Sequence, residues 1–130
     1  MMDIIAYSKA AKVQNELNQI VGKKPGKNLC NPSEVVSGIL EYNGTVSESS
    51  RYSTSGFIPI KNGVTYFFAA VSRSDSSAYA NTRHRSALYD DAFSFISGTY
   101  IDESLTHGLE ITVNNSGAKY LRVCVDNSDN

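Results

Sequence analysis

Hydrophobic residues near the start of the chain recur at intervals of four, three, four and three. The positions are Ala6, Ala10, Val13, Leu17 and Ile20. This alternation is typical of a coiled-coil seam, and it predicts an α-helix over residues 4–21. Asp3 is the expected N-cap, Gly22 the expected stop, and Pro25 forbids continuation.

The predicted helix admits two interpretations. Its apolar stripe either packs on the chain's own sheet, or identical helices from several chains form a bundle that carries the rest of the chain as heads. Residues 22–27 are polar and rich in turn formers, as expected of a neck between separate elements, which favours the bundle. The sequence therefore predicts an oligomerisation helix in residues 1–24 and a head domain in residues 25–130.

From Lys27 onward the hydrophobic period changes to two, which is the period of strands. In residues 109–113 and 121–125 every second residue is Leu, Ile or Val, and residues 114–117 are turn formers. We expect these two runs to pair as an antiparallel hairpin with one apolar face.

The dipeptide Asn62-Gly63 signals a second hairpin, between residues 57–60 and 64–71. Pro59 has no N–H to donate, so either the first strand is bulged or it pairs elsewhere. Residues 64–71 are apolar at positions of both parities near their centre, which predicts a central strand that is covered on both faces.

Shorter runs complete the pattern, at residues 28–30, 35–40, 86–89 and 93–96, with Asp90-Asp91-Ala92 as a tight turn between the last two. The total is about seven or eight short strands separated by Gly, Asn and Ser turns, which is typical of two-sheet β folds. The predicted fold is therefore mainly β, an N-terminal coiled-coil-like α-helix followed by a β-sandwich or jelly-roll domain.

Composition and charge limit the kinds of partner that the protein is expected to bind. The 130 residues include 13 acidic and 12 basic ones, for a net charge of −1, which gives no basic face for nucleic acid. No run is long enough for a transmembrane helix, and the N-terminus lacks a secretory pattern. We therefore expect free thiols at Cys30 and Cys124, although a disulfide stays open if the first and last strands are neighbours.

The search for catalytic chemistry finds little. There is no metal-binding spacing around His84 and His107, and no nucleophile elbow. The adjacent acids at residues 90–91 and 102–103 point to opposite faces of a strand and cannot converge. We expect a protein that is not an enzyme and that needs no metal or cofactor.

Binding is the better-supported role. Sugar recognition combines aromatic faces with planar polar groups, and loops carried by a rigid scaffold commonly supply both. One long excursion offers such residues, namely Arg73, Asp75, Tyr79, Asn81, Arg83, His84 and Arg85. They are the predicted ligand-binding residues, and a solvated loop or a subunit contact is the alternative.

The order of several motifs suggests a family. Lys27-Asn28-Leu29 is followed by "YSTSGFIPIKNGVTY" from residue 52, "ALYDDAFSFISG" from residue 87 and "AKYLRVCV" from residue 118. This order resembles a β-sandwich module of bacteriophage tail fibres, baseplate proteins and other virion appendages, over about residues 27–125. The motifs describe turns and core positions, and they fix no binding residues.

The resemblance implies a virion protein made in the host cytoplasm. A short trimerising helix before a β head is similar to phage fibre and receptor-binding architecture. The expected partners are other copies of the chain, further virion proteins bound through the helix, and a host-surface glycan bound by the head. Alternatives are a capsid-decoration or head-fibre protein with a structural role only, and a stand-alone carbohydrate-binding module.

Overall fold

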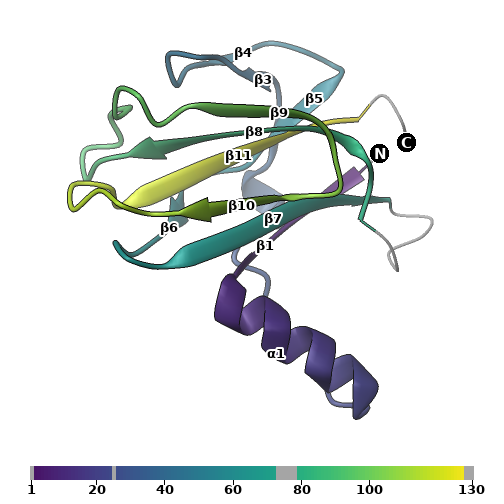
Figure 1. The fold of residues 1–130 in the computed structure, drawn as a ribbon. Coiled ribbons are helices and arrows are strands. Elements are labelled where there is room, and N and C mark those ends of the chain that lie inside the picture. The colour runs from purple at the N-terminus through teal and green to yellow at the C-terminus, as the bar shows by residue number, and fades with distance from the viewer. Residues whose placement is uncertain (1, 25, 73–78, 128–130) are drawn as a thin grey trace.

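The computed structural model describes residues 2–24, 26–72 and 79–127. Within these ranges the chain is mainly β, with antiparallel strands throughout and a single α-helix near the N-terminus (Figure 1). The expected mainly β class with an N-terminal helix is confirmed.

Two sheets form the body of the molecule. The first has the order β1–β7–β10 and consists of β1 (Met2–Ser8), β7 (Thr65–Ser72) and β10 (Leu109–Thr112). The second has the order β2–β5–β11–β8–β9 and consists of β2 (Val36–Ser37), β5 (Tyr52–Thr54), β11 (Tyr120–Asp126), β8 (Thr82–Tyr89) and β9 (Ile101–Thr106).

Smaller elements attach to these sheets. Strand β11 also pairs with β6 (Ile58–Pro59). A separate pair of short strands consists of β3 (Ile39–Leu40) and β4 (Val46–Ser47). The α-helix α1 (Lys9–Ile20) follows β1, and the 3-10 helix η1 (Pro32–Glu34) precedes β2.

The N-terminal segment is a strand and not the first turns of a helix. Strand β1 runs antiparallel to β7, with Ile4 opposite Ala70, and it buries every second side chain. The helix begins only after Ser8, whose hydroxyl accepts a hydrogen bond from the Ala11 N–H at 3.2 Å. The prediction of a helix from residue 4 capped by Asp3 was therefore wrong, because Ala6 fits both the helical spacing and the strand alternation.

The predicted end of the helix is confirmed. Gly22 has φ 76°, a left-handed conformation that glycine adopts without a Cβ penalty. Its N–H bonds to the Gln19 carbonyl at 3.4 Å, and the Lys23 N–H bonds to the Asn18 carbonyl at 2.7 Å. This is a Schellman motif, which satisfies carbonyls that the helix leaves without partners.

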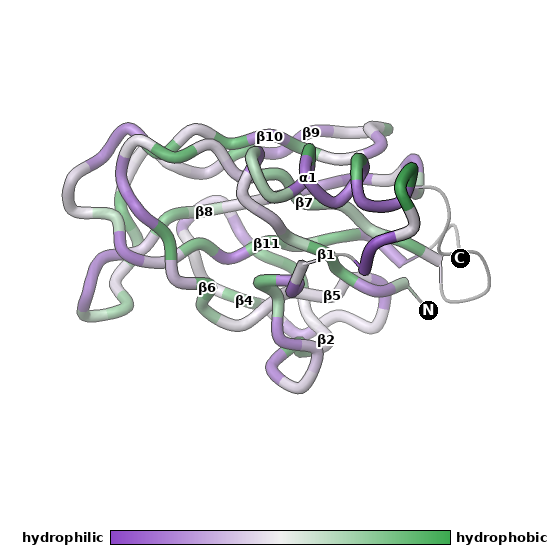
Figure 2. The backbone as a smooth tube through the Cα atoms, turned by 90° about the horizontal axis from the view of Figure 1, so that it is seen from below, coloured by the Kyte–Doolittle hydropathy of each residue, from purple (hydrophilic) through white to green (hydrophobic). Residues whose placement is uncertain are grey.

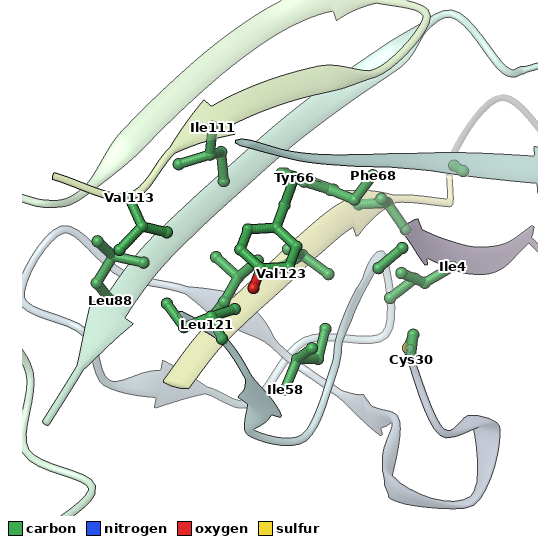
Figure 3. Packing of buried hydrophobic residues seen from close by; sticks show 14 of the residues in the cluster. Ile4, Cys30, Ile58, Tyr66, Phe68, Leu88, Ile111, Val113, Leu121 and Val123 are labelled. Carbon is green, nitrogen blue, oxygen red and sulfur yellow. The ribbon is translucent and has the colours of Figure 1, made fainter. Parts of the chain in front are cut away.

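The main core lies between the two sheets. Strand β7 contributes Tyr66 and Phe68 to it, and β11 contributes Leu121 and Val123 from the other side (Figure 3). Residues 66–71 of β7 are all buried, and β7 pairs with β1 on one side and β10 on the other. The expectation of a central strand covered on both faces is confirmed.

A second cluster covers the outer face of the larger sheet, beside β3 and β4. Its buried members are Leu40, Ala87, Tyr89 and Cys124. Cys30 instead belongs to the main core, and both cysteines are buried and free. The two thiols therefore occupy different packing clusters, one on each face of β11's sheet.

Strand pairing differs from the sequence expectation in one place. Strands β10 and β11 lie in different sheets, so the predicted hairpin of residues 109–113 with 121–125 was wrong. Both apolar faces still point into the shared core, which is why the alternation looked like a hairpin. The first run of the other predicted hairpin pairs elsewhere, as one alternative expected, with Pro59 opposite Tyr120.

Two of the shorter predicted strands are irregular. Residues 29–30 form a bend, and residues 93–96 form a loop beside the end of β8, with an isolated bridge between Phe95 and Tyr89 and an Ile96 N–H that bonds to the Leu88 carbonyl at 3.0 Å. The tight turn after Tyr89 is confirmed, with the Phe93 N–H bonding to the Asp90 carbonyl at 3.0 Å.

Candidate functional site

Helix α1 carries its apolar side chains on the outside. Val13, Leu17 and Ile20 are 56%, 49% and 82% exposed. The one residue of α1 that is buried is Asn15, which is polar. A surface helix ordinarily turns its apolar stripe toward the core, so this arrangement is the reverse of the usual one. The helix extends away from the sheets (Figure 1), and apolar and polar segments alternate along it (Figure 2).

Polar contacts hold the N-terminal half of α1 against the body. The Lys12 ammonium lies 4.7 Å from the centroid of the Phe67 ring on β7 and 2.7 Å from the Glu16 carboxylate. The hydrogen bond that Lys12 donates to the Glu16 carboxylate raises the Lys12 pKa, so the cation is retained. Lys9 also lies 3.6 Å from the Glu110 carboxylate on β10. The lysines thus face the sheet, and the apolar stripe faces outward.

Lys24 and Gly26 contact the helix on the way back to β1, and the Lys24 carbonyl accepts from the Asn18 side chain at 3.4 Å. The Gly26 N–H donates to Asn15 Oδ1 at 2.6 Å. The Asn28 side chain then bonds to two backbone groups of β1, donating to the Ile4 carbonyl at 3.1 Å and accepting from the Ala6 N–H at 2.7 Å. The segment expected to be a neck is therefore anchored at its far end.

The predicted oligomerisation residues divide into two groups. Ala10, Val13, Leu17 and Ile20 are exposed on one side of α1. Ala6 is buried in β1 and faces the main core, so its assignment to the helical seam was wrong. It cannot contact another chain while β1 stays in the sheet.

An apolar groove opens at the base of α1. Its volume is about 820 Å³, and Ala10, Leu29, Ile60 and Val64 are among the residues that line it. Because Ala10 belongs both to this groove and to the exposed side of α1, the two apolar surfaces are continuous. No local pattern indicated the groove, because its residues come from three separate stretches of the chain, within 7–11, 27–29 and 59–66.

The predicted ligand-binding residues do not gather on one surface. Arg73 and Asp75 lie outside the described residues. Asn81 is exposed, and the Tyr79 ring packs against Phe67 with 5.0 Å between centroids. His84 is fully buried and contacts the Phe68 ring. His84 therefore belongs to the core, and its assignment to a surface site was wrong.

The two arginines of this set that the structure describes, Arg83 and Arg85, share one carboxylate on the outer face of the larger sheet. Arg83 Nε lies 3.0 Å from Asp102 Oδ1, and Arg85 Nε lies 3.6 Å from Asp102 Oδ2. The Arg85 guanidinium is also buried against the Tyr52 ring, 4.6 Å from its centroid. Arg85 therefore links strand β8 to β9 and β5. Of these two arginines, only Arg83 keeps a partly exposed guanidinium.

Strand β8 ends and β11 begins at the same end of the larger sheet (Figure 1). A second groove lies there. Its volume is about 440 Å³, and its lining is Glu34, Gly56, Phe57, Phe93, Tyr120 and Arg122. The rings of Phe93 and Tyr120 are stacked, with 4.7 Å between centroids, and the Arg122 guanidinium lies 4.6 Å above the Phe57 ring. The term aromatic groove is used below for these six residues.

The sequence held one usable signal for the aromatic groove. Tyr120 and Arg122 alternate with Leu121 and Val123 on β11, so they had to lie on the face away from the core. Their neighbours could not be foreseen, because Phe93 was assigned to a strand and Glu34 arrives from η1. Only the tertiary fold brings these segments together.

Other kinds of site find no support in the described ranges. Across residues 2–24, 26–72 and 79–127, no three His, Cys, Asp or Glu side chains are grouped as metal ligands. None of the helical segments in these ranges has the length and apolar character needed to cross a membrane.

Comparisons with protein-family models, with curated proteins and with solved structures each gave no match to this chain.

Proposed function

We propose that this protein is a structural component of a bacteriophage virion, of the fibre or baseplate type. In this proposal α1 assembles the chain as a homotrimer in coiled-coil fashion. The sheets form a β-sandwich head of the jelly-roll kind, which binds a host-surface glycan without transforming it. The resemblance of residues 27–125 to virion-appendage modules supports the class of protein.

The observation that carries the assembly is the exposed apolar side of α1. Burying one Val, Leu or Ile side chain is worth about 1.5–3 kcal/mol, so three of them left in water are costly. Contiguous exposed apolar surface on a soluble protein commonly marks a contact site. The spacing of Ala10, Val13, Leu17 and Ile20 is self-complementary, which makes a second copy of the same helix the natural partner.

The residue types favour more than two chains. In heptad terms Ala10 and Leu17 occupy a positions, and Val13 and Ile20 occupy d positions. Leu at a with Ile at d shifts coiled coils from dimers toward trimers and tetramers. The helix has 12 residues, so its seam spans only about 18 Å at 1.5 Å per residue. The apolar groove at its base would extend the contact onto the body of the neighbouring chain.

Sedimentation velocity on the whole chain tests the assembly. The wild-type protein is expected to sediment as a species with about three times the 14.2 kDa mass of the chain. Leu17→Asp places a charge in the seam and is expected to give monomers with an unchanged far-ultraviolet spectrum. Leu105→Asp changes an equally apolar residue, 74% exposed on β9, and is the matched control that keeps the oligomer. A wild-type chain that is monomeric at every concentration overturns the assembly.

A further inference from the structure

We infer that the aromatic groove is a binding site for an uncharged pyranose sugar, with Phe93 and Tyr120 as its stacking surface. The inference rests on the proposed glycan-binding function and names the site and the class of ligand. It moves that function away from the long excursion after β7, because Tyr79 and His84 pack against β7 and Arg85 packs against Tyr52 on β5.

The aromatic rings form a continuous surface. Phe57 lies 4.9 Å from Phe93 and 6.1 Å from Tyr120 between centroids, while Phe93 and Tyr120 stack at 4.7 Å with 29° between their planes. Phe93 is 51% exposed, so the outer surface of the stack is open to solvent. The C–H bonds on one side of a pyranose ring carry partial positive charge, which suits the negative face of an aromatic ring.

The backbone holds Phe93 in a strained conformation. Its φ is 63°, in the left-handed region that a bulky side chain rarely adopts. Asp90 fixes the turn, since its Oδ1 accepts from both the Ala92 N–H and the Ser94 N–H at 2.9 Å. Such strain persists when the surroundings over-determine it, and it is concentrated at functional sites. Here it holds a large apolar ring half in water, which core packing alone does not require.

The polar groups of the groove are a donor and an acceptor. Arg122 uses Nε to donate to the Ser55 carbonyl at 2.9 Å, and its guanidinium lies over Phe57. Across the described ranges Arg122 forms no ion pair, and burial lowers its pKa. Its terminal N–H groups are thus available to donate to ligand hydroxyls.

Glu34 supplies the acceptor on the opposite side of the groove. It is exposed at the end of η1 and lines the groove together with Gly56. A Cβ at Gly56 would lie 2.8 Å from both Glu34 Cβ and Oε1, so glycine is what allows this carboxylate to sit where it does. One cation and one anion leave the groove without net charge.

The charged pair and the volume of the aromatic groove together determine which class of ligand it can bind. Sugar hydroxyls both donate and accept, so they can use a guanidinium and a carboxylate at once. An acidic sugar would bring a second carboxylate beside Glu34, and a purely apolar ligand would leave both charged groups without water or partners. A volume of about 440 Å³ lies within the usual range for small-ligand sites.

A glycan array and an NMR titration test the inference. The array carries neutral oligosaccharides of glucose, galactose, mannose, N-acetylglucosamine and rhamnose, with sialylated and uronate-containing glycans as further arms. The best-bound neutral glycan is then titrated into labelled wild-type protein. The largest shifts are expected in the side-chain resonances of Phe93, Tyr120 and Arg122.

Two variants locate the site. Phe93→Gly removes the ring and suits a φ of 63°, so it is expected to keep the fold while affinity falls about tenfold. Leu105→Gly is the matched control, because Leu105 also has a left-handed φ, of 56°, and is exposed on β9. It is expected to bind as the wild type does.

The outcomes separate this inference from the proposed function. Loss of binding in Phe93→Gly alone, with shifts at the aromatic groove, supports both. Glycan binding with unchanged affinity in Phe93→Gly, or with shifts elsewhere, overturns the aromatic groove and leaves the glycan-binding head standing. Binding of acidic glycans only overturns the neutral ligand class. Absence of binding on every arm overturns both and favours a purely structural virion protein.

Discussion

His84 on β8 accepts a hydrogen bond from the backbone N–H of Ala70 on β7, with 3.3 Å between Nε2 and N. The other ring nitrogen, Nδ1, lies 2.8 Å from the Thr82 carbonyl and donates to it in the neutral tautomer. The neutral imidazole thus satisfies both nitrogens while fully buried between the sheets. A proton on Nε2 would place two N–H groups against each other, and burial lowers the His84 pKa.

Stability should therefore fall on mild acidification. The unfolded chain takes up a proton on His84 near its ordinary pKa of about 6.5, whereas the folded protein does so only at lower pH. The contribution of neutral His84 to the free energy of unfolding is present above pH 6.5 and is lost as the pH falls toward the folded-state pKa. The loss is at most about 1.4 kcal/mol per pH unit. Urea unfolding between pH 7.5 and 5.5 measures the slope.

Two histidine variants identify the source of that slope. His84→Gln is expected to flatten the pH dependence, and His107→Gln, at an exposed position that contributes less than burial to the His84 pKa, is expected to leave most of it intact. The same slope in His84→Gln as in the wild type would contradict the assignment.

The cap of α1 gives a second prediction. Ser8→Ala removes the acceptor for the Ala11 N–H and is expected to lower the free energy of unfolding by about 1 kcal/mol. It should also weaken any assembly that α1 supports, since the helix frays at its attached end. Ser8→Asp preserves a capping oxygen and is the control. Equal stability of the alanine and aspartate variants in thermal melts would show that the cap contributes nothing.

The two cysteines should be unreactive in the folded protein. Burial raises the pKa of Cys30 to about 11, and Cys124, whose pKa burial also raises, is fully enclosed in the outer cluster. A thiol reagent at pH 8 needs the thiolate, so reaction should be slow in buffer and fast in urea. Prompt labelling of one thiol per chain without denaturant would contradict this burial.

The main core should be far more sensitive than the exposed apolar positions. Phe68 is fully enclosed at the centre of β7, and Phe68→Ala is expected to cost about 3–5 kcal/mol through the lost contacts and the cavity. Leu105→Ala, at an exposed position, should change the free energy of unfolding by less than about 0.5 kcal/mol. Comparable urea midpoints for the two variants would place the core elsewhere.

The sequence pattern predicted which faces of the strands are buried better than it predicted which strands pair. The alternation in residues 121–125 correctly placed Leu121 and Val123 inward. It could not say that the neighbour is β8 and not β10, because any strand with one apolar face fits either. Pro59 was informative, since its missing N–H excluded the simple local hairpin.

The helix and the candidate site show the same limit. The 3-4 spacing correctly predicted a helix whose apolar residues lie on one side, but it placed the start of the helix at residue 4 and not at Lys9, because short segments can match both periods. The predicted ligand residues were chosen from one contiguous excursion. The aromatic groove joins Glu34, Phe57, Phe93 and Tyr120, which are far apart in sequence, so no local pattern could group them.

The return of the chain from α1 to β1 through Asn28 has a mechanical consequence. A fibre head on a single flexible tether can swivel about its stalk. Here Ser8 leads into the helix and Asn28 binds β1 again 20 residues later, so the body is fastened to both ends of the same helical excursion. In a bundle built on α1, every head would point in a set direction, and copies of one surface would be presented at a fixed spacing.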